Sequence, residues 1–233
     1  MAEKGIRSEK TEKKETSSKK ETILVLGAHS DDFVIGAGGT LAQYAAEGKK
    51  VISVVFSFGE KSHPWLRQGI VQKTRSLEAF EAGRILKLQK LLFYDLEEMK
   101  FYEDYHQKNI EKELLELIEK EKPSKIFTHS LEDPHPDHKA INKITLELWN
   151  KIDLNKRPEV YIYSVWNIVS LQTKYPALYV NISKTFSLKL NALKAFRSQR
   201  IQVAYPFVLL LLRGIRDGFK IRKIFGEKFF RIK

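Results

Sequence analysis

The sequence predicts an α/β fold: a Rossmann-like, mostly parallel sheet with helices on both faces. Short apolar segments alternate with segments of helical periodicity over the first 150 residues, an order typical of parallel strands joined by crossover helices. Two polar motifs rich in His and Asp directly follow two of the apolar segments. In open parallel sheets, functional groups gather beyond the carboxyl ends of the strands, so the motifs lie where this fold would place a site.

The first half of the chain supplies four predicted strands, each a short run of apolar, β-branched or aromatic residues. These strands cover residues 22–27, 51–58, 91–94 and 125–128.

Three helices are expected between these strands. A glycine-rich loop beginning at Gly36 leads into the first helix, which ends at Gly48 as its C-cap. Apolar positions at helical spacing predict the second helix over 71–86. The third is amphipathic, covers 108–120 and is stopped by the proline that follows.

The second half of the chain is less regular. We expect a helix from about 137 to 150, strands at 160–165 and 178–182, a helix at 185–198 and a final strand at 228–232. Between 199 and 227 apolar and basic residues are mixed, and no element is given bounds there.

Composition limits the classes of protein that the chain can belong to. The chain has 233 residues, 42% of them hydrophobic, which suits one large domain over residues 21–233. Residues 1–20 are charged and almost without apolar side chains, so we expect a disordered tail. Cysteine is absent, which excludes disulfides, thiolate metal ligands and a cysteine nucleophile and is compatible with the cytoplasmic location that we expect.

The net charge of +12 raises the question of polyanionic partners. We expect no nucleic-acid partner, because no recognisable nucleic-acid-binding motif accompanies the charge. The basic C-terminal stretch 213–233 leaves two readings open, a helix and strand packed on the core or a peripheral contact with an anionic membrane, and we favour the first. The possible membrane contact is suggested by the phenylalanines that accompany the basic residues, which are Phe207, Phe219, Phe225, Phe229 and Phe230.

Homo-oligomer formation is also left open.

The two polar motifs carry the chemistry. His29 is followed by Asp31 and Asp32, and the second motif supplies His135, Asp137 and His138. Catalytic zinc sites use three protein ligands drawn from His and carboxylate and keep one position open. A His-x-x-Asp pair from one loop and a histidine from the other can fill three positions, which leaves a carboxylate as base and a histidine as electrostatic catalyst.

A structural explanation exists for each motif on its own. Adjacent Asp31 and Asp32 are suited to capping the helix that follows them. In the second motif, the prolines favour a loop and Asp137 is placed to cap the next helix. That both motifs are purely structural is the less favoured interpretation.

These motifs resemble the signatures of the PIG-L (LmbE-like) metal-dependent N-deacetylases. The first signature is Ala-His-Ser-Asp-Asp at 28–32 followed by Gly-Ala-Gly-Gly-Thr-Leu-Ala at 36–42, and the second is His-Pro-Asp-His at 135–138. Two residues depart from the pattern: Ser30 where the family usually has proline, and Phe33 where an acidic residue is common. We expect Phe33 to change the shape of the substrate pocket.

The resemblance implies an LmbE-like fold and a role for each matching residue. His29, Asp32 and His138 would hold Zn²⁺ or another divalent transition metal, and Asp31 would be the general base that takes a proton from the attacking water.

The resemblance also assigns residues to the substrate. His135, oriented by Asp137, would stabilise the oxyanion or protonate the leaving amine. Arg75 and Asp95 would contact substrate hydroxyls.

The function implied is a zinc-dependent N-deacetylase that hydrolyses the acetamide of an N-acetylglucosamine-type sugar or glycoconjugate. Two alternatives stay open: a zinc amidohydrolase acting on a non-sugar amide, and a basic membrane- or polyanion-binding protein whose loops are only structural.

Overall fold

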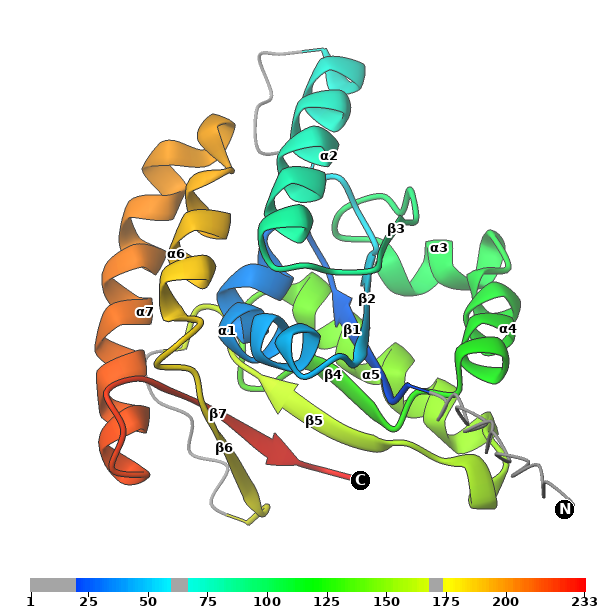
Figure 1. The fold of residues 1–233 in the computed structure, drawn as a ribbon. Helices are drawn as coiled ribbons and strands as arrows, with labels where there is room; N and C mark the ends of the chain where they lie inside the picture. Colours follow the sequence, from blue (N-terminus) through cyan, green and yellow to red (C-terminus); the bar gives the residue numbers. More distant parts are fainter. Residues whose placement is uncertain (1–19, 60–66, 168–173) are drawn as a thin grey trace, which may run out of the picture.

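A computed structural model describes residues 20–59, 67–167 and 174–233, without the side chains of 200–205. Its centre is a seven-stranded sheet in the order β3-β2-β1-β4-β5-β7-β6 (Figure 1). The first five strands in that order are parallel, and β7 runs antiparallel to both of its neighbours. The predicted mostly parallel α/β sheet is therefore confirmed. The strands are β1 (Thr22–Gly27), β2 (Lys50–Val55), β3 (Lys90–Phe93), β4 (Lys125–His129), β5 (Glu159–Tyr163), β6 (Ala177–Asn181) and β7 (Gly226–Arg231).

Helices cover both faces of the sheet because its buried strands are apolar on both sides. In β1, Ile23 and Val25 join the core under α1, α2, α6 and α7, whereas Leu24 and Leu26 join the core under α3, α4 and α5. The helices are α1 (Asp32–Ala46), α2 (Gln68–Ile85), α3 (Phe101–Gln107), α4 (Ile110–Glu121), α5 (Pro136–Lys151), α6 (Phe186–Lys194) and α7 (Arg200–Lys220), with short 3₁₀ turns η2 (Leu154–Lys156) and η3 (Arg197–Gln199).

The strand order reverses between β1 and β4, which is where an open α/β sheet forms a crevice. The chain proceeds from β1 to β2 and β3 on one side and from β4 to β5 on the other. Both His/Asp motifs follow the carboxyl ends of these two central strands. The topology thus brings together two loops that are about a hundred residues apart in sequence.

The first helix begins earlier than the sequence predicts. Residues from Gly36 onward belong to the interior of α1, which starts at Asp32, rather than to a loop. A Cβ atom on Gly36 would lie 2.2 Å from the Tyr163 ring, and one on Gly39 would lie 2.7 Å from Ile182. The glycines therefore serve close packing of α1. The predicted C-cap is correct, since Gly48 follows the helix with φ +80°.

A buried ion pair ties the end of the chain to the middle of α1. Lys189 Nζ lies 2.5 Å from Glu227 Oε1 and also donates to the carbonyl of Ile35. Glu227 in turn accepts hydrogen bonds from the backbone amides of Gly39 and Thr40. Lys189 and Glu227 therefore join α1, α6 and β7 through polar contacts within the core.

Helix α3 was not predicted, and the bounds of α7 were not. Helix α3 has only seven residues, and its aromatic residues have low helix propensity. Helix α7 carries Pro206 in its interior, and its run of consecutive apolar residues obscured where the helix begins. The predicted helix over 185–198 is interrupted after Lys194 and continues as η3. The expected charged tail lies outside the described residues apart from Lys20, so its disorder and the extent of the domain stay predictions.

The packing of Gly36 generates a test. Gly36→Ala is expected to lower the free energy of unfolding by about 1–3 kcal/mol, because the added methyl group must displace a buried tyrosine ring. Gly83→Ala in α2 is the matched control: its Cβ would make an ordinary 3.5 Å contact, and alanine favours the helix by up to about 1 kcal/mol. Urea unfolding measures both, and equal effects of the two substitutions would contradict the packing role.

Candidate metal centre and active site

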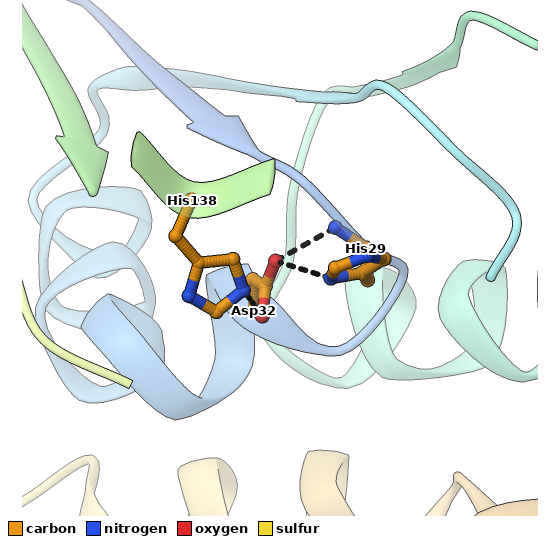
Figure 2. A group of neighbouring side chains, drawn as sticks. All are labelled: His29, Asp32 and His138. Carbon is orange, nitrogen blue, oxygen red and sulfur yellow. Dashed lines mark hydrogen bonds and ion pairs between the residues drawn. The ribbon is translucent and has the colours of Figure 1, made fainter. Parts of the chain in front are cut away.

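Three side chains meet at the carboxyl ends of β1 and β4. His29 comes from the turn after β1, Asp32 begins α1, and His138 comes from the first turn of α5 (Figure 2). One ligand atom from each residue lies within 4.8 Å of the others. Asp32 stands between the two rings, with Oδ2 3.5 Å from His29 Nδ1 and Oδ1 3.5 Å from His138 Nε2.

The donor set fits a divalent transition metal. All three residues are buried, and His138 Nε2 is a buried nitrogen without a hydrogen-bond partner, although it faces the Asp32 carboxylate. Two imidazole nitrogens and one carboxylate are the ligand types that catalytic zinc sites use. A second group of possible ligands, His29, His135 and Asp137, shares His29 with the first.

Asp32 is ionised in this setting. Its burial would raise the pKa of the carboxyl, but the nearby His138 and His129 rings hold that pKa well below its usual range. Oδ2 also accepts a 2.7 Å hydrogen bond from the backbone amide of His29. This hydrogen bond from the amide of His29 to the side chain of Asp32 closes the turn and fixes both candidate ligands. Neither Asp31 nor Asp32 caps α1 in the predicted way, since the N-cap Asp31 makes no side-chain capping bond.

Asp133, which was not predicted from the sequence, orients His138. Its Oδ1 lies 2.8 Å from His138 Nδ1, and its Oδ2 accepts hydrogen bonds of 3.1 Å from the amides of Val165 and Trp166. Although burial would raise the pKa of Asp133, these contacts lower it to about 2. The carboxylate thus lies against Nδ1, and Nε2 of His138 faces Asp32. Its position two residues before the second motif is the feature of the sequence that could have identified it.

His129 joins the two central strands and was also not singled out. Its Nε2 lies 3.0 Å from the amide of Ala28, which donates to it, and 3.2 Å from the hydroxyl of Tyr163. Burial and the charge of His138 lower the pKa of His129 to about 4, so the ring is neutral and its Nε2 accepts the bond from Ala28. It is therefore a structural link between β1, β4 and β5.

The second motif does not cap α5 through Asp137. His135 is the N-cap, and its Nδ1 accepts a 3.2 Å hydrogen bond from the amide of Asp137. The proton of the neutral ring is accordingly assigned to Nε2. Burial and the charges on His29 and His138 lower the pKa of His135. The ring is about a third exposed, so it faces the open side of the site.

Two carboxylates face the outer nitrogen of His29. Asp137 Oδ2 lies 3.3 Å and Glu98 Oε1 3.5 Å from Nε2, and Asp137 also accepts a bond from the amide of Met99. Burial would lower the pKa of His29, but Asp137 and Asp32 raise it to about 10. Glu98 was not predicted, because it lies outside both motifs in the segment after β3.

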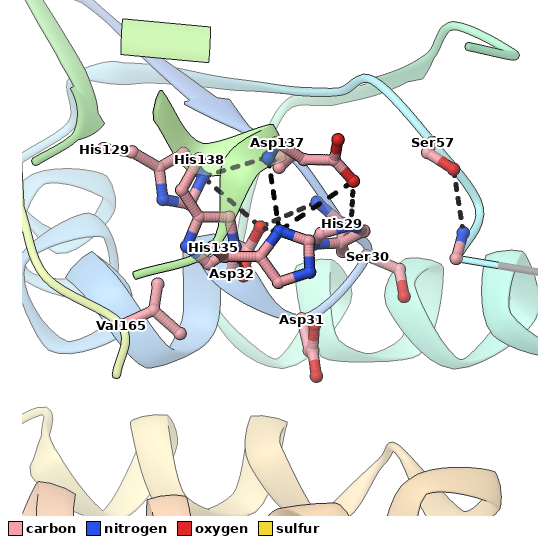
Figure 3. A network of polar contacts seen from close by, with 12 residues as sticks. His29, Ser30, Asp31, Asp32, Ser57, His129, His135, Asp137, His138 and Val165 are labelled. Atoms are coloured by element: carbon pink, nitrogen blue, oxygen red, sulfur yellow. Dashed lines mark hydrogen bonds and ion pairs between the residues drawn. The ribbon is translucent and has the colours of Figure 1, made fainter. Parts of the chain in front are cut away.

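Asp31 points away from the three candidate ligands, as Figure 3 shows. Its side chain is 18% exposed, and Oδ1 lies 3.7 Å from Nη2 of Arg75. Burial raises the pKa of Asp31, and the Asp32 charge adds to this rise against the opposing effect of Arg75. Arg75 itself is buried and donates to Ser30 Oγ at 3.0 Å and to the carbonyl of Gly59 at 2.7 Å. Ser30, the departure from the family pattern, therefore helps to hold Arg75.

Two further predicted residues lie away from this cluster. Asp95 is exposed after β3 and accepts a 3.3 Å bond from Gln72. Phe33 is fully buried in the apolar core on the α1 face, so the expectation that it shapes the substrate pocket is wrong. Its position in the first turn of α1 directs the ring into the core.

Comparison with known proteins agrees with the motifs. The family model PIG-L, described as GlcNAc-PI de-N-acetylase, matches residues 24–149. A probable N-acetyl-alpha-D-glucosaminyl L-malate deacetylase 2 of Bacillus cereus is 28% identical over 190 residues, which are 76% of this chain and 83% of that protein.

Two solved structures share the fold. The N,N'-diacetylchitobiose deacetylase of Pyrococcus horikoshii superposes with a TM-score of 0.75 at 23% identity and covers 91% of this chain and 84% of its own. The 4-carboxy-2-hydroxymuconate hydratase of Pseudomonas putida also gives a TM-score of 0.75, at 24% identity, and covers 91% and 96%. One fold thus accommodates two kinds of named activity.

The contact between Asp133 and His138 predicts a loss of metal affinity. Asp133→Asn removes the charge that fixes Nδ1, and affinity for Zn²⁺ is expected to fall about 10–100-fold. Competition against a chromogenic chelator measures this, with a thermal melt to establish that the variant is folded. Asp153→Asn, which alters an exposed carboxylate beside η2, is the control. Unchanged affinity in folded Asp133→Asn would contradict the orienting role.

Proposed function

Because the chain belongs to the PIG-L family, we propose that it is a metal-dependent N-deacetylase that releases acetate from an N-acetylated sugar or glycoconjugate. The observation that carries the proposal is the buried group of His29, Asp32 and His138 with Asp31 beside it. The relative named as a deacetylase of a glucosaminyl malate supports the substrate class.

We propose that His29, Asp32 and His138 hold the metal. Zn²⁺ is preferred, because imidazole and carboxylate suit it and no thiolate is available, although iron, manganese and cobalt accept the same ligands. When bound, such an ion acidifies water to a pKa near 7 and polarises the amide carbonyl. Asp133, Asp137 and Glu98 would keep the histidines oriented toward it.

Asp31 is proposed as the general base. It is the carboxylate of the first motif that does not face the metal ligands, and part of its side chain is open to solvent. Burial raises the pKa of Asp31, which makes the carboxylate a better proton acceptor than an exposed aspartate. Arg75, fixed by Ser30 and Gly59, would hold Asp31 in place beside the attacking water.

His135 is proposed to act on the other side of the scissile bond. Its Nε2 carries the ring proton, because Nδ1 accepts the amide of Asp137. In the neutral ring, Nε2 would donate a hydrogen bond to the developing oxyanion, and the ring would have to be protonated first to give a proton to the leaving amine. Asp137, between His135 and His29, would orient the ring and stabilise its positive charge.

Arg75 and Asp95 remain proposals as substrate contacts. Asp95 is exposed and has room to accept a hydrogen bond from a sugar hydroxyl. Arg75 is 4% exposed, which limits its contact with a substrate to the part of the guanidinium beside Asp31. A cytoplasmic location, compatible with the absence of cysteine, also remains a proposal.

Two substitutions separate the base from the ligands. Asp31→Asn is expected to reduce kcat by about 10²–10⁴-fold with the metal content unchanged, because proton transfer is lost and the ligands are intact. His138→Ala is expected to lose the metal as well as activity, since one of three ligands is removed. Metal analysis of purified variants and an acetate assay give both readouts. A near-normal rate in Asp31→Asn would disprove its role as base.

The reaction class is tested by acetate release. Incubation with a panel of N-acetylated sugars and non-sugar N-acetyl amides is expected to yield acetate from the sugars, and removal of metal with a chelator should abolish it until Zn²⁺ is restored. Acetate from non-sugar amides alone would favour the alternative amidohydrolase. No acetate from any amide, with hydration of an unsaturated tricarboxylic acid instead, would replace the proposal by the activity named for the hydratase of the same fold.

A further inference from the structure

Helix α7 exposes an apolar stripe that nothing in the described chain covers. Val208, Leu212, Ile215 and Phe219 are exposed by 55%, 60%, 49% and 81%. Their spacing of four, three and four residues puts them on one face of the helix, over about 16 Å of its length. Leu209, Leu210 and Asp217 on the opposite face are buried against the core. The apolar stripe is therefore exposed to solvent and is not part of the core.

The stripe ends in a basic, apolar turn. Lys220, Arg222 and Lys223 are exposed directly after Phe219, and Ile224 beside them is 71% exposed. The acidic side chains between Pro206 and Arg231 are Asp217 and Glu227, and both are buried and paired with a cation. The combined surface thus offers large apolar side chains and positive charge without an exposed carboxylate of its own.

This arrangement corrects the sequence-based picture of an aromatic, basic C-terminus. Phe229 and Phe230 are buried in the sheet, and Phe225 stacks on Phe186 with ring centres 3.9 Å apart. Packing on the core therefore accounts for these phenylalanines. Phe219 is the exposed exception. Its neighbours on the surface are the aliphatic residues of α7, which were not predicted to lie beside it.

A second copy of the chain does not complement this surface. A twofold contact through α7 would bring the same helix against itself, either parallel or antiparallel. In the parallel case, Lys220, Arg222 and Lys223 would face their own copies. In the antiparallel case they would face the first turns of α7, where residues 200–216 contain no Asp or Glu. Either arrangement leaves the cations without an opposite charge.

We propose that the exposed face of α7 and the turn at 219–224 form a docking surface for an anionic lipid bilayer. An amphipathic helix with bulky apolar residues and flanking lysine and arginine lies in the plane of a membrane interface, with the apolar side chains among the headgroups and the cations on anionic lipid. No helix in the described ranges has the length and apolar composition needed to cross a bilayer. None of the proposed metal ligands belongs to this surface.

Co-sedimentation of the full chain with vesicles tests the proposal. The wild type is expected to bind vesicles of phosphatidylcholine mixed with phosphatidylserine at low salt, and to bind vesicles of phosphatidylcholine alone far more weakly. Lys220→Glu combined with Lys223→Glu should weaken binding about 25-fold or more, at about fivefold for each lysine near the anionic surface. Leu212→Gln combined with Phe219→Gln should weaken it about tenfold or more through lost apolar insertion.

Matched variants on α4, which lies across the molecule from α7 in Figure 1, separate the surface from the net charge. Lys112→Glu combined with Lys120→Glu makes the same change in net charge on that exposed helix and should leave binding within about twofold. Thermal melts check folding, and light scattering without lipid reports the oligomeric state. The proposal is overturned if the wild type ignores anionic vesicles, if the α7 variants bind as well as the wild type, or if the α7 substitutions only dissociate an oligomer.

Discussion

The burial of one carboxylate, Asp32, sets the conditions for the rest of the site. A carboxylate this deep in a protein is stable only if several groups compensate its charge. Here the compensating groups come from two places: the His29 amide in the turn after β1 and the His138 ring in α5. The central strands and α5 must therefore be in register before Asp32 is tolerated, and the same contacts gather the ligands that a metal would need.

The site divides into a buried part and an accessible part. His29, Asp32 and His138 are enclosed, and carboxylates behind the two histidines fix their rings. Asp31 and His135 remain partly exposed on the open side. Neighbouring residues of one motif fall into different parts because each motif lies at the junction of a strand or loop with a helix, where successive side chains point in different directions. This separation permits rigid metal ligands beside groups that have to reach substrate and solvent.

Local patterns predicted what depends on local structure. The strands β1 and β4 are apolar runs, and the motifs after them contain the residues that the structure brings together. The roles of Asp133, His129 and Glu98 depend on partners distant in sequence: Asp133 binds the amide of Val165, and His129 binds that of Ala28. The start of α1 was missed for the same reason, since Gly36 looks like a loop residue until Tyr163 packs against it. Sequence spacing contains no information on such pairs.

The place of β7 in the sheet has a consequence for synthesis on the ribosome. β6, which ends at Asn181, joins the sheet through β7, which begins only at Gly226 and lies between β6 and β5. Glu227 on β7 also satisfies the amides of Gly39 and Thr40 in α1. A nascent chain that has emerged as far as α6 therefore has a parallel sheet with an open edge and an α1 that lacks its contact with Glu227. We expect chaperones that bind exposed strand edges to recognise that intermediate until β7 leaves the exit tunnel.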